Sequence, residues 1–369
     1  MLGFLPITDG VSHNTHTGSI PTRRAPFLPL ELWIMAVKYF KPRDLLAMSA
    51  TCREWYRVAH ALARFLPIDT RLVGVRNSDK LMGWLRDDTL KTWDFHAKLV
   101  LSSTQTEVWM IQQFGQVHTL NLSWCDVVDV SPLRNVHTLN LIYCENVVDV
   151  SALGNVHTLN LSGCTNVVDV SALGNVHNIN LSYCHNLVDV SALGNVYTLD
   201  LSGCRNLVDV SALGNVHTLK LSECEKVVDV RALGNVHTLN LSWCDNLVDV
   251  SALGSVHTLD LGLCPRISNV SALGNVHTLD LSECMNVVDV SALGNVHTLD
   301  LSWCANVVDV SALGKVHILD LHGCDGVVDV SALGKVHTLK LICCPNVVDV
   351  SALGNVNIIR QIGVEGPSL

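Results

Sequence analysis

The chain contains 369 residues, of which 49% are hydrophobic and 16% are charged, and its formal net charge is −10 at pH 7. This composition excludes an intrinsically disordered chain, and no apolar run approaches the ~18 residues that a membrane-spanning helix needs. The charge is uneven, because residues 1–116 hold 14 Lys+Arg against 10 Asp+Glu, whereas residues 117–356 hold 9 against 23. Binding of DNA or RNA requires a basic face. The acidic segment therefore argues against nucleic acid as the main partner.

The beginning of the chain and its cysteines bear on the cellular compartment. The first thirty residues contain no basic segment followed by an apolar core, so we expect no secretory signal and no membrane partner. The sequence also contains 14 cysteines. Without a signal, this cysteine content indicates reduced thiols. We therefore expect a cytoplasmic or nuclear protein.

The N-terminal region predicts a small helical module. Residues 1–26 mix Gly, Pro and Thr with other types and are expected to form a flexible segment, whereas residues 27–60 predict three short helices. Pro29 opens the first helix, Pro42 ends it and Asp44 caps the second. The third helix has an apolar stripe made of Cys52, Trp55, Tyr56 and Ala59. So short a module cannot bury a sufficient core alone, so it is expected to bind a partner.

This module resembles the F-box, whose pattern is Leu-Pro-x-Glu-Leu, then aliphatic residues, Asp-Leu-Leu and Cys-Arg-x-Trp. The chain supplies these motifs in order at Leu28–Leu32, Asp44–Leu46 and Cys52–Trp55. The resemblance implies contact with a Skp-type adaptor, and through it a cullin, by Leu28, Pro29, Leu32, Leu45, Leu46 and Trp55. Ala36 and Thr51 depart from the pattern, which predicts reduced adaptor affinity. The alternative is an unrelated helical cap of the segment that follows.

Residues 61–116 contain no repeat. Aromatic residues at Trp84, Trp93 and Phe95 precede Lys98–Leu101, which is expected to form a first, irregular strand. We assign this stretch to a linker and to the N-terminal cap of a repeat array.

A repeat begins at Val117. Eleven units of equal length start at Val136, Val156 and so on to Val336, and an opening unit at Val117 is one residue shorter. A thirteenth start at Val356 passes into a C-terminal tail over 357–369. A fixed period of about 20 residues is typical of a solenoid. The sequence therefore predicts a solenoid of twelve units over residues 117–356.

Each unit predicts one coil of the solenoid. The Leu-x-Leu alternation, as at Leu139 and Leu141, indicates a short strand with one face inward. The Asp-Val-Ser-Ala-Leu-Gly segment offers a cap, a brief turn and a glycine suited to positive φ. Because so short a unit leaves no room for a strand and a full helix, turns or 3₁₀ pieces are expected on the outer side. Stacked coils then bury each other's Val, Leu and Cys rows.

The unit resembles the leucine-rich repeat, whose core motif Leu-x-x-Leu-x-Leu-x-x-Asn/Cys recurs throughout 117–356 with Val in the first place. The stretch Asp-Val-Ser-Ala/Pro-Leu, with its proline at Pro132, resembles the short internalin-type variant. The expected fold is thus an α/β solenoid, a leucine-rich repeat array with a parallel sheet, preceded by a three-helix F-box.

Stacking converts each repeat position into a row, and three rows suggest chemistry. The Cys row, from Cys125 to Cys344, could form a metal or disulfide ladder, but we interpret it as buried structural thiols. The His row from His118 to His337, interrupted by Tyr197, could bind metal, but a neutral hydrogen-bonded edge row is favoured. The Asp row, as at Asp149, could bind calcium, but is better explained as local backbone caps. We expect no metal and no cofactor.

Two positions vary between otherwise similar units. One is the residue between the two Leu of the strand, which is Asn, Asp or Lys; the other precedes the Cys. Both are expected on or beside the open face of the sheet, where aromatic and charged residues are typical of a protein-binding surface. Sequence drift on an unselected surface is the alternative. The aromatic candidates for target binding are Trp124, Tyr143, Tyr183, Trp243 and Trp303.

The F-box and the array together resemble a substrate receptor of cullin-type ubiquitin ligases. The resemblance implies that the box binds the adaptor, that the repeats hold a target protein and that the chain is not itself an enzyme. It also places the protein in a eukaryotic or virus-infected cell. A non-degradative scaffold, or a decoy that sequesters the adaptor, is the alternative. Recurrent Ser, His and Asp do not indicate a hydrolase, because near-equivalent copies provide no unique pocket.

Overall fold

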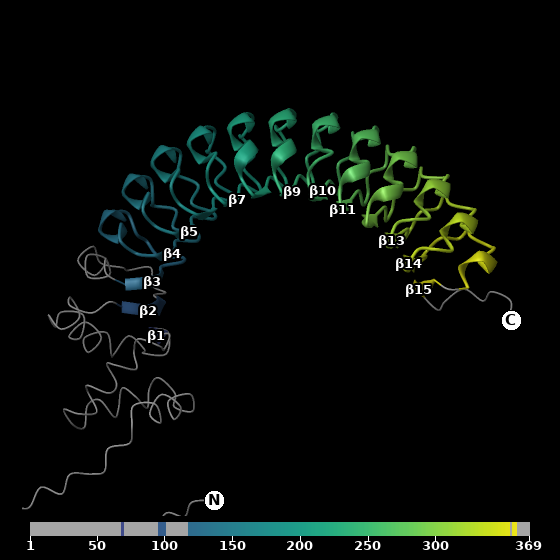
Figure 1. Ribbon diagram of the computed structural model, residues 1–369. Helices are drawn as coiled ribbons and strands as arrows, with labels where there is room; N and C mark the ends of the chain where they lie inside the picture. The colour runs from purple at the N-terminus through teal and green to yellow at the C-terminus, as the bar shows by residue number, and fades with distance from the viewer. Residues whose placement is uncertain (1–67, 70–94, 101–116, 355, 360–369) are drawn as a thin grey trace, which may run out of the picture.

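The structure is a computed structural model that describes residues 68–69, 95–100, 117–354 and 356–359. The repeats form an arc whose strands line the inner side and whose 3₁₀ pieces lie on the outer side (Figure 1). The strands are β1 (Ile68–Asp69), β2 (Phe95–Val100), β3 (Val117–Asn121), β4 (Thr138–Asn140), β5 (Thr158–Asn160), β6 (Asn178–Asn180), β7 (Thr198–Asp200), β8 (Thr218–Lys220), β9 (Thr238–Asn240), β10 (Thr258–Asp260), β11 (Thr278–Asp280), β12 (Thr298–Asp300), β13 (Ile318–Asp320), β14 (Thr338–Lys340) and β15 (Asn357–Ile359).

Each strand from β4 to β15 follows a 3₁₀ piece of the outer side. These pieces are η4 (Ser131–Leu133), η5 (Ser151–Leu153), η6 (Ser171–Leu173), η7 (Ser191–Leu193), η8 (Ser211–Asn215), η9 (Arg231–Asn235), η10 (Ser251–Leu253), η11 (Ser271–Asn275), η12 (Ser291–Asn295), η13 (Ser311–Leu313), η14 (Ser331–Leu333) and η15 (Ser351–Leu353). The described coils therefore contain strands and 3₁₀ turns, as expected from the shortness of the unit.

The fifteen strands form one parallel sheet in sequence order. Equivalent residues pair from coil to coil, so that Leu239 lies beside Leu259 and Leu259 beside Leu279. The alternation inside each strand turns this Leu inward and leaves its two neighbours on the exposed face. The predicted leucine-rich repeat solenoid with a parallel sheet is confirmed.

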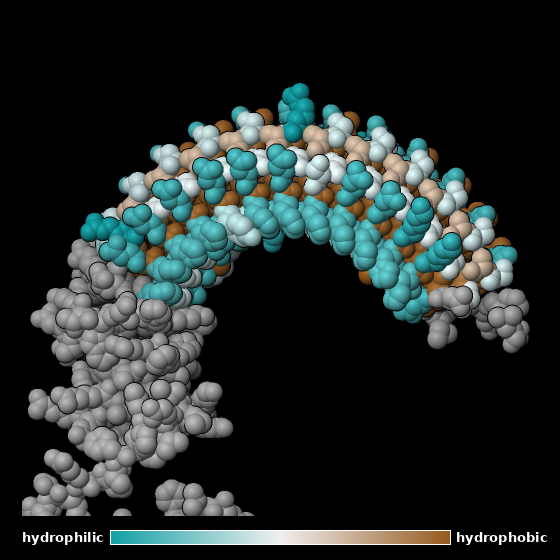
Figure 2. Space-filling view, in the orientation of Figure 1, coloured by the Kyte–Doolittle hydropathy of each residue, from teal (hydrophilic) through white to brown (hydrophobic). Residues whose placement is uncertain are grey.

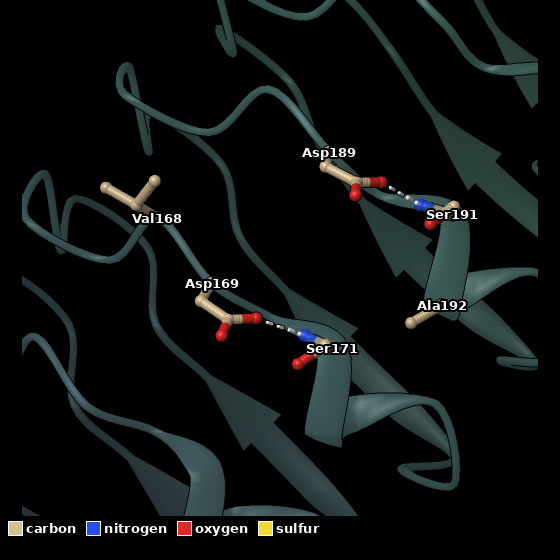
Figure 3. Close-up of a pocket in the computed structure, with 6 residues that line it drawn as sticks. All are labelled: Val168, Asp169, Ser171, Asp189, Ser191 and Ala192. Atoms are coloured by element: carbon tan, nitrogen blue, oxygen red, sulfur yellow. Dashed lines mark hydrogen bonds between the residues drawn. The ribbon is translucent and has the colours of Figure 1, made fainter.

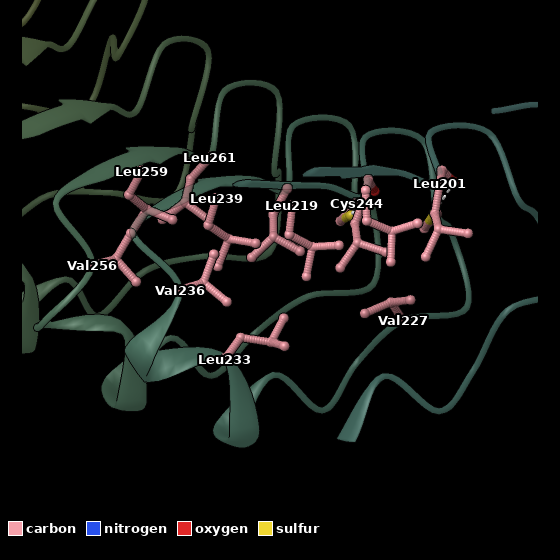
Figure 4. Close-up of a cluster of buried hydrophobic side chains, with 14 of the residues drawn as sticks. Leu201, Leu219, Val227, Leu233, Val236, Leu239, Cys244, Val256, Leu259 and Leu261 are labelled. Atoms are coloured by element: carbon pink, nitrogen blue, oxygen red, sulfur yellow. Dashed lines mark hydrogen bonds between the residues drawn. The ribbon is translucent and has the colours of Figure 1, made fainter. Parts of the chain in front are cut away.

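The core is a continuous stack of apolar rows. One coil contributes seven buried residues, namely Val236, Leu239, Leu241, Cys244, Leu247, Val250 and Leu253. Figure 4 shows such residues from neighbouring coils packed side by side along the solenoid. Because each row is covered only by the coils on either side, an isolated coil would leave it exposed to water. Truncating one such Leu to Ala removes packing worth about 2–5 kcal/mol.

The outer turns are fixed by the Asp row. The Asp149 carboxylate accepts a hydrogen bond from the Ser151 backbone N–H at 2.9 Å, at the beginning of η5. The same bond recurs in the other coils, and Asn269 replaces the carboxylate at 3.1 Å from Ser271 N. The interpretation of this row as local backbone caps is confirmed.

The glycine of the Leu-Gly pair differs from the prediction. Gly154 has φ −61°, in the right-handed region, so the expected positive φ is wrong. Glycine is needed there for another reason: an added Cβ would lie 2.4 Å from the carbonyl oxygen of Ala172 in the next coil. The outer turns approach each other too closely for a side chain. Positive φ occurs elsewhere in the coil.

At the N-terminal end, β2 pairs with β3 with a register shift between Phe95 and Lys98. The irregular strand expected at 98–101 begins earlier, at Phe95, and Leu101 lies outside the described residues. The expected F-box helices over 27–60, and the adaptor residues Leu28, Pro29, Leu32, Leu45, Leu46 and Trp55, lie outside the described residues.

Candidate interaction surface

The exposed face of the sheet is polar. In β4 the residues on either side of buried Leu139 are Thr138 and Asn140, which are half-buried on the inner side of the arc. Asn140 Oδ1 accepts a hydrogen bond from the backbone N–H of Ile142 at 3.0 Å, which fixes the chain as it leaves the strand. The same bond is made by an Asp in other coils, for example from Ser282 N to Asp280 at 2.8 Å. This position therefore tolerates Asn and Asp equally in backbone terms, so its charge is free to vary.

The charge at this position changes along the arc. The first four coils have a neutral amide, at Asn121, Asn140, Asn160 and Asn180. Later coils are mainly charged, with Asp200, Lys220, Asn240, Asp260, Asp280, Asp300, Asp320 and Lys340. Lys220 lies 3.9 Å from Asp200, and Lys340 lies 2.6 Å from Asp320. The open face is thus neutral at its N-terminal end and acidic toward its C-terminal end.

The residue before each core Cys has positive φ in all twelve coils. Nine of them are not glycine, namely Trp124, Tyr143, Tyr183, Glu223, Trp243, Leu263, Glu283, Trp303 and Cys343, with φ between 53° and 63°. The left-handed region costs a residue with a Cβ roughly 1–2 kcal/mol. The sequence reasoning missed this conformation, although glycine at three of the twelve positions, Gly163, Gly203 and Gly323, was a signal for it.

The local hydrogen bonds explain why the chain turns here. The backbone N–H of Tyr143 donates to Ser162 O of the next coil at 2.8 Å, and the N–H of Cys144 then donates back to Leu141 O at 3.0 Å. Adjacent residues thus donate to different coils, Tyr143 to the next coil and Cys144 to its own. The turn satisfies both and sends Cys144 into the core while Tyr143 remains exposed.

The aromatic candidates all lie in this left-handed row, at the end of the strands. Their exposed fractions range from 38% for Tyr183 to 64% for Trp124. Trp124 and Tyr143 stack with ring centroids 4.2 Å apart. The other three, Tyr183, Trp243 and Trp303, lie in separate coils along the same edge. The structure therefore brings one pair together and distributes the rest along the arc.

Glycine in the next coil makes room for three of these rings. A Cβ at Gly163 would lie 2.4 Å from the ring of Tyr143, and one at Gly203 would lie 2.5 Å from the ring of Tyr183. Gly323 has the same relation to Trp303, at 2.6 Å. Each ring therefore lies over the following glycine. The Tyr183 hydroxyl reaches one coil further and donates to Glu223 at 3.2 Å.

The histidines form a stacked row before the strands, at the inner edge of the arc, where Figure 2 shows a hydrophilic band. Neighbouring rings are 4.4–4.9 Å apart, and Tyr197 continues the stack between His177 and His217. Nδ1 of most of these rings lies 3.1–3.3 Å from the hydroxyl of the following Thr, as in His237 and Thr238. The rings are mostly parallel, so their nitrogens do not converge. Within the described residues no group of His, Cys, Asp or Glu has the geometry of a metal site.

At three positions of this row the surroundings favour the neutral imidazole. The pKa values of His157, His237 and His297 are lowered, first because stacking removes water and second because protonated neighbours repel. Loss of hydration is thus the larger contribution at these three positions, and repulsion between like charges is the smaller one.

The cysteines behave as core residues. Cys125 to Cys324 are buried, and each Sγ of the row from Cys144 onward donates to a Leu carbonyl of the preceding coil, as Cys164 does to Leu141 O at 3.1 Å. Burial raises the pKa of Cys164 to about 12. No disulfide links the cysteines in the described part of the chain. The prediction of buried structural thiols is confirmed for this row, while Cys344 is only partly buried beside exposed Cys343.

The outer side offers a shallow depression between two turns. Its lining residues are Val168, Asp169, Ser171, Asp189, Ser191 and Ala192 (Figure 3). Each carboxylate accepts a hydrogen bond from the backbone N–H of the Ser two residues later. Hydrogen bonds from the side chain and the backbone of that Ser lower the pKa values of both Asp residues. Because this turn recurs along the array, the depression repeats a structural motif and provides no unique pocket.

Comparisons with known proteins found matches for the segment before the array and for the array itself. Residues 25–65 match the F-box-like family. The chain is similar to an internalin, InlF from Listeria monocytogenes, at 19% identity with a TM-score of 0.56, covering 79% of this chain and 96% of InlF. It is also similar to a leucine-rich repeat protein from Leptospira interrogans, at 17% identity with a TM-score of 0.45, covering 74% of this chain and 82% of that protein. No curated protein matches the chain.

The class of protein follows from these observations. The likeness to InlF shows the fold, which is that of an internalin-like leucine-rich repeat solenoid. The chain combines this solenoid with a segment that matches the F-box-like family. No helix in the described ranges has the length and hydropathy required to cross a bilayer.

Proposed function

We propose that the protein is the substrate-recognition subunit of a Skp/cullin/F-box ubiquitin ligase. The observation that carries the proposal is the order of its parts: an F-box-like segment at 25–65 precedes a solenoid with one long open face. A receptor of this kind needs one site for the ligase and a separate site for the target. The chain offers both on one polypeptide.

The adaptor contact is assigned to the F-box-like segment. Leu28, Pro29 and Leu32 begin the matching motif, and Leu45, Leu46 and Trp55 supply its later apolar positions. A module of this size gains most of its buried apolar surface by binding a partner. The Skp-type adaptor would provide that surface, and the cullin would be reached through the adaptor.

Target binding is assigned to the inner side of the arc and its aromatic edge. Trp124, Tyr143, Tyr183, Trp243 and Trp303 are each at least 38% exposed. Tyr and Trp contribute most to protein interfaces when they enter pockets of a partner. Their left-handed backbone costs stability, a cost that glycine at the same position would avoid. Exposed aromatic rings at these positions are therefore better explained by binding than by folding.

The proposed role requires no chemistry from the chain itself. Holding a target beside a ubiquitin-loaded enzyme converts an encounter in solution into a reaction at high effective concentration. The stacked coils provide a stiff spacer for this purpose, because each coil is packed along its whole length against its neighbours.

Co-purification tests the proposal. The full chain is expected to recover adaptor and cullin from eukaryotic cells, and Leu28→Ala with Pro29→Ala is expected to lose both. The matched control is Leu5→Ala with Pro6→Ala, which removes the same dipeptide outside the F-box-like match. This control is expected to retain both partners. Equal recovery by all three proteins would contradict the proposal.

The second candidate function is a scaffold or an adaptor-sequestering decoy. It is favoured by Ala36 and Thr51, which replace a larger aliphatic residue and Val in the F-box pattern. Recovery of adaptor without cullin would support the decoy. Under the ligase proposal, Ala36→Leu is expected to increase adaptor recovery while the cullin remains in proportion.

A further inference from the structure

The acidic end of the open face contains an unbroken row of carboxylates. Asp260, Asp280, Asp300 and Asp320 occupy the same position in β10–β13 and lie in register on adjacent strands. At the usual spacing of ~4.8 Å between strands, the row is about 14 Å long. Elsewhere on the described face no more than one Asp occurs in succession at this position.

Each carboxylate is oriented by the backbone. Oδ1 of Asp280 accepts the N–H of Ser282 at 2.8 Å, and Oδ1 of Asp300 accepts that of Ser302 at 2.8 Å. Asp260 and Asp320 make the equivalent bonds at 3.0 Å. One oxygen of each residue is therefore fixed in the strand-end turn, and the row is pre-organised on the sheet.

The two ends of the row show which groups it accepts. Asn240 Nδ2 donates to Asp260 Oδ2 at 2.7 Å, and Lys340 Nζ donates to Asp320 Oδ2 at 2.6 Å. The middle of the row is formed by Asp280 and Asp300, and no Lys or Arg of residues 117–354 pairs with either carboxylate. The molecule thus places an ammonium against the last carboxylate and leaves the middle two without a cation from the described array.

Partial burial of these carboxylates makes their negative charge unfavourable without a nearby cation. Burial raises the pKa values of Asp260 and Asp300, and repulsion from neighbouring carboxylates raises them further. An ammonium or guanidinium from a partner would relieve both effects, and Lys340 already places an ammonium against Asp320 at the end of the row. Trp303, three residues after Asp300 in the chain, is 47% exposed and offers an aromatic ring of the kind that attracts cations.

We propose that the face of β10–β13 binds a lysine- or arginine-rich segment of the target protein. This proposal specifies the chemistry of the target and rests on the receptor function proposed above. An extended chain rises ~3.3 Å per residue, so basic residues at alternate positions over five residues span about 13 Å and match the row. The carboxylates lie in a line rather than around a point, which favours several separate cationic groups over one metal ion. A nucleic acid is excluded by its charge.

Fluorescence anisotropy on the full chain tests the proposal. The probe is a labelled peptide of alternating Lys and Ser, and its matched control is the same peptide with Glu in place of Lys. Asp280→Asn with Asp300→Asn removes two charges from the face, and Asn already occupies this position in the first four coils. The control protein, Asp289→Asn with Asp309→Asn, removes two charges from the outer turns, where Asn269 already replaces Asp.

The expected result is binding of the Lys peptide but not of the Glu peptide. The inner pair of substitutions is expected to weaken binding roughly tenfold at low salt, and the outer pair less than about twofold. Equal weakening by both pairs would overturn the proposal, because overall acidity would then explain the affinity. No binding of the Lys peptide would also overturn it. Adaptor recovery by the same proteins separates this failure from failure of the receptor function.

Discussion

The positive φ of the residue before each core Cys predicts that glycine stabilises the protein at this position. Glu283 has φ 57°, and its side chain is exposed, while its backbone N–H donates to Ser302 O at 2.8 Å. Replacing it with Ala retains a Cβ in the left-handed region, whereas replacing it with Gly removes the strain. The backbone hydrogen bond remains in both variants. The two proteins therefore differ in backbone energetics alone.

The magnitude follows from two opposing contributions. The left-handed conformation costs a residue with a Cβ roughly 1–2 kcal/mol. Glycine loses more conformational entropy on folding, which costs about 0.5–1 kcal/mol relative to Ala. Glu283→Gly should therefore exceed Glu283→Ala in stability by roughly 0.5–1 kcal/mol. For an array of this size, that difference corresponds to a shift in Tm of about 1–4 °C.

Thermal and urea unfolding of the full chain measure this difference. The matched control is Ala172→Gly, because Ala172 is exposed in η6 and its 3₁₀ conformation suits any residue. There glycine is expected to lower stability, by about 0.5–1 kcal/mol. The order of Gly and Ala should thus reverse between the two positions. If Ala is the more stable residue at both, the left-handed geometry is wrong.

Three further predictions concern the other rows. Gly234→Ala places a Cβ 2.5 Å from Ala252 O and should lower the free energy of unfolding by about 1–3 kcal/mol in urea. Gly354→Ala, with open space around it and right-handed φ, should not lower it. The pKa values of His157, His237 and His297 are lowered in the folded chain, so the unfolded chain binds more protons. Tm should therefore fall as the pH drops below 6.5, the ordinary pKa of histidine. A flat Tm between about pH 7.5 and 5.5 would refute this. In a Cys52→Ser background, iodoacetamide should modify exposed Cys343 first and the buried row only after unfolding, which mass spectrometry would detect.

The fold could be predicted because the period is a physical constraint. A unit this short, with Leu at alternate positions, has room for one strand and a brief turn, so stacking in register is the arrangement that buries every Leu and Cys. The Asp caps were equally predictable, because an Asp two residues before a turn N–H bonds locally. These features depend on one coil and its immediate copies.

The details that depend on close approach between coils could not be predicted from one unit. Gly154 has ordinary φ and is required by the carbonyl of Ala172, an atom that belongs to the next coil. The left-handed turn at Trp243 accompanies hydrogen bonds from adjacent N–H groups to the next coil and to the same coil, and the variable side chains at that position concealed it. The carboxylate row was visible as separate Asp residues, but its unpaired middle required the positions of Asn240 and Lys340.

The central claim is that the array holds a target while the F-box-like segment delivers it for degradation. Proximity labelling in eukaryotic cells, followed by half-life measurement of the captured proteins, tests it most directly. The account predicts that the wild-type chain and the Leu28→Ala, Pro29→Ala variant capture the same proteins, and that these proteins live longer in cells with the variant. Equal half-lives with both chains would contradict a ligase receptor and leave a binding scaffold.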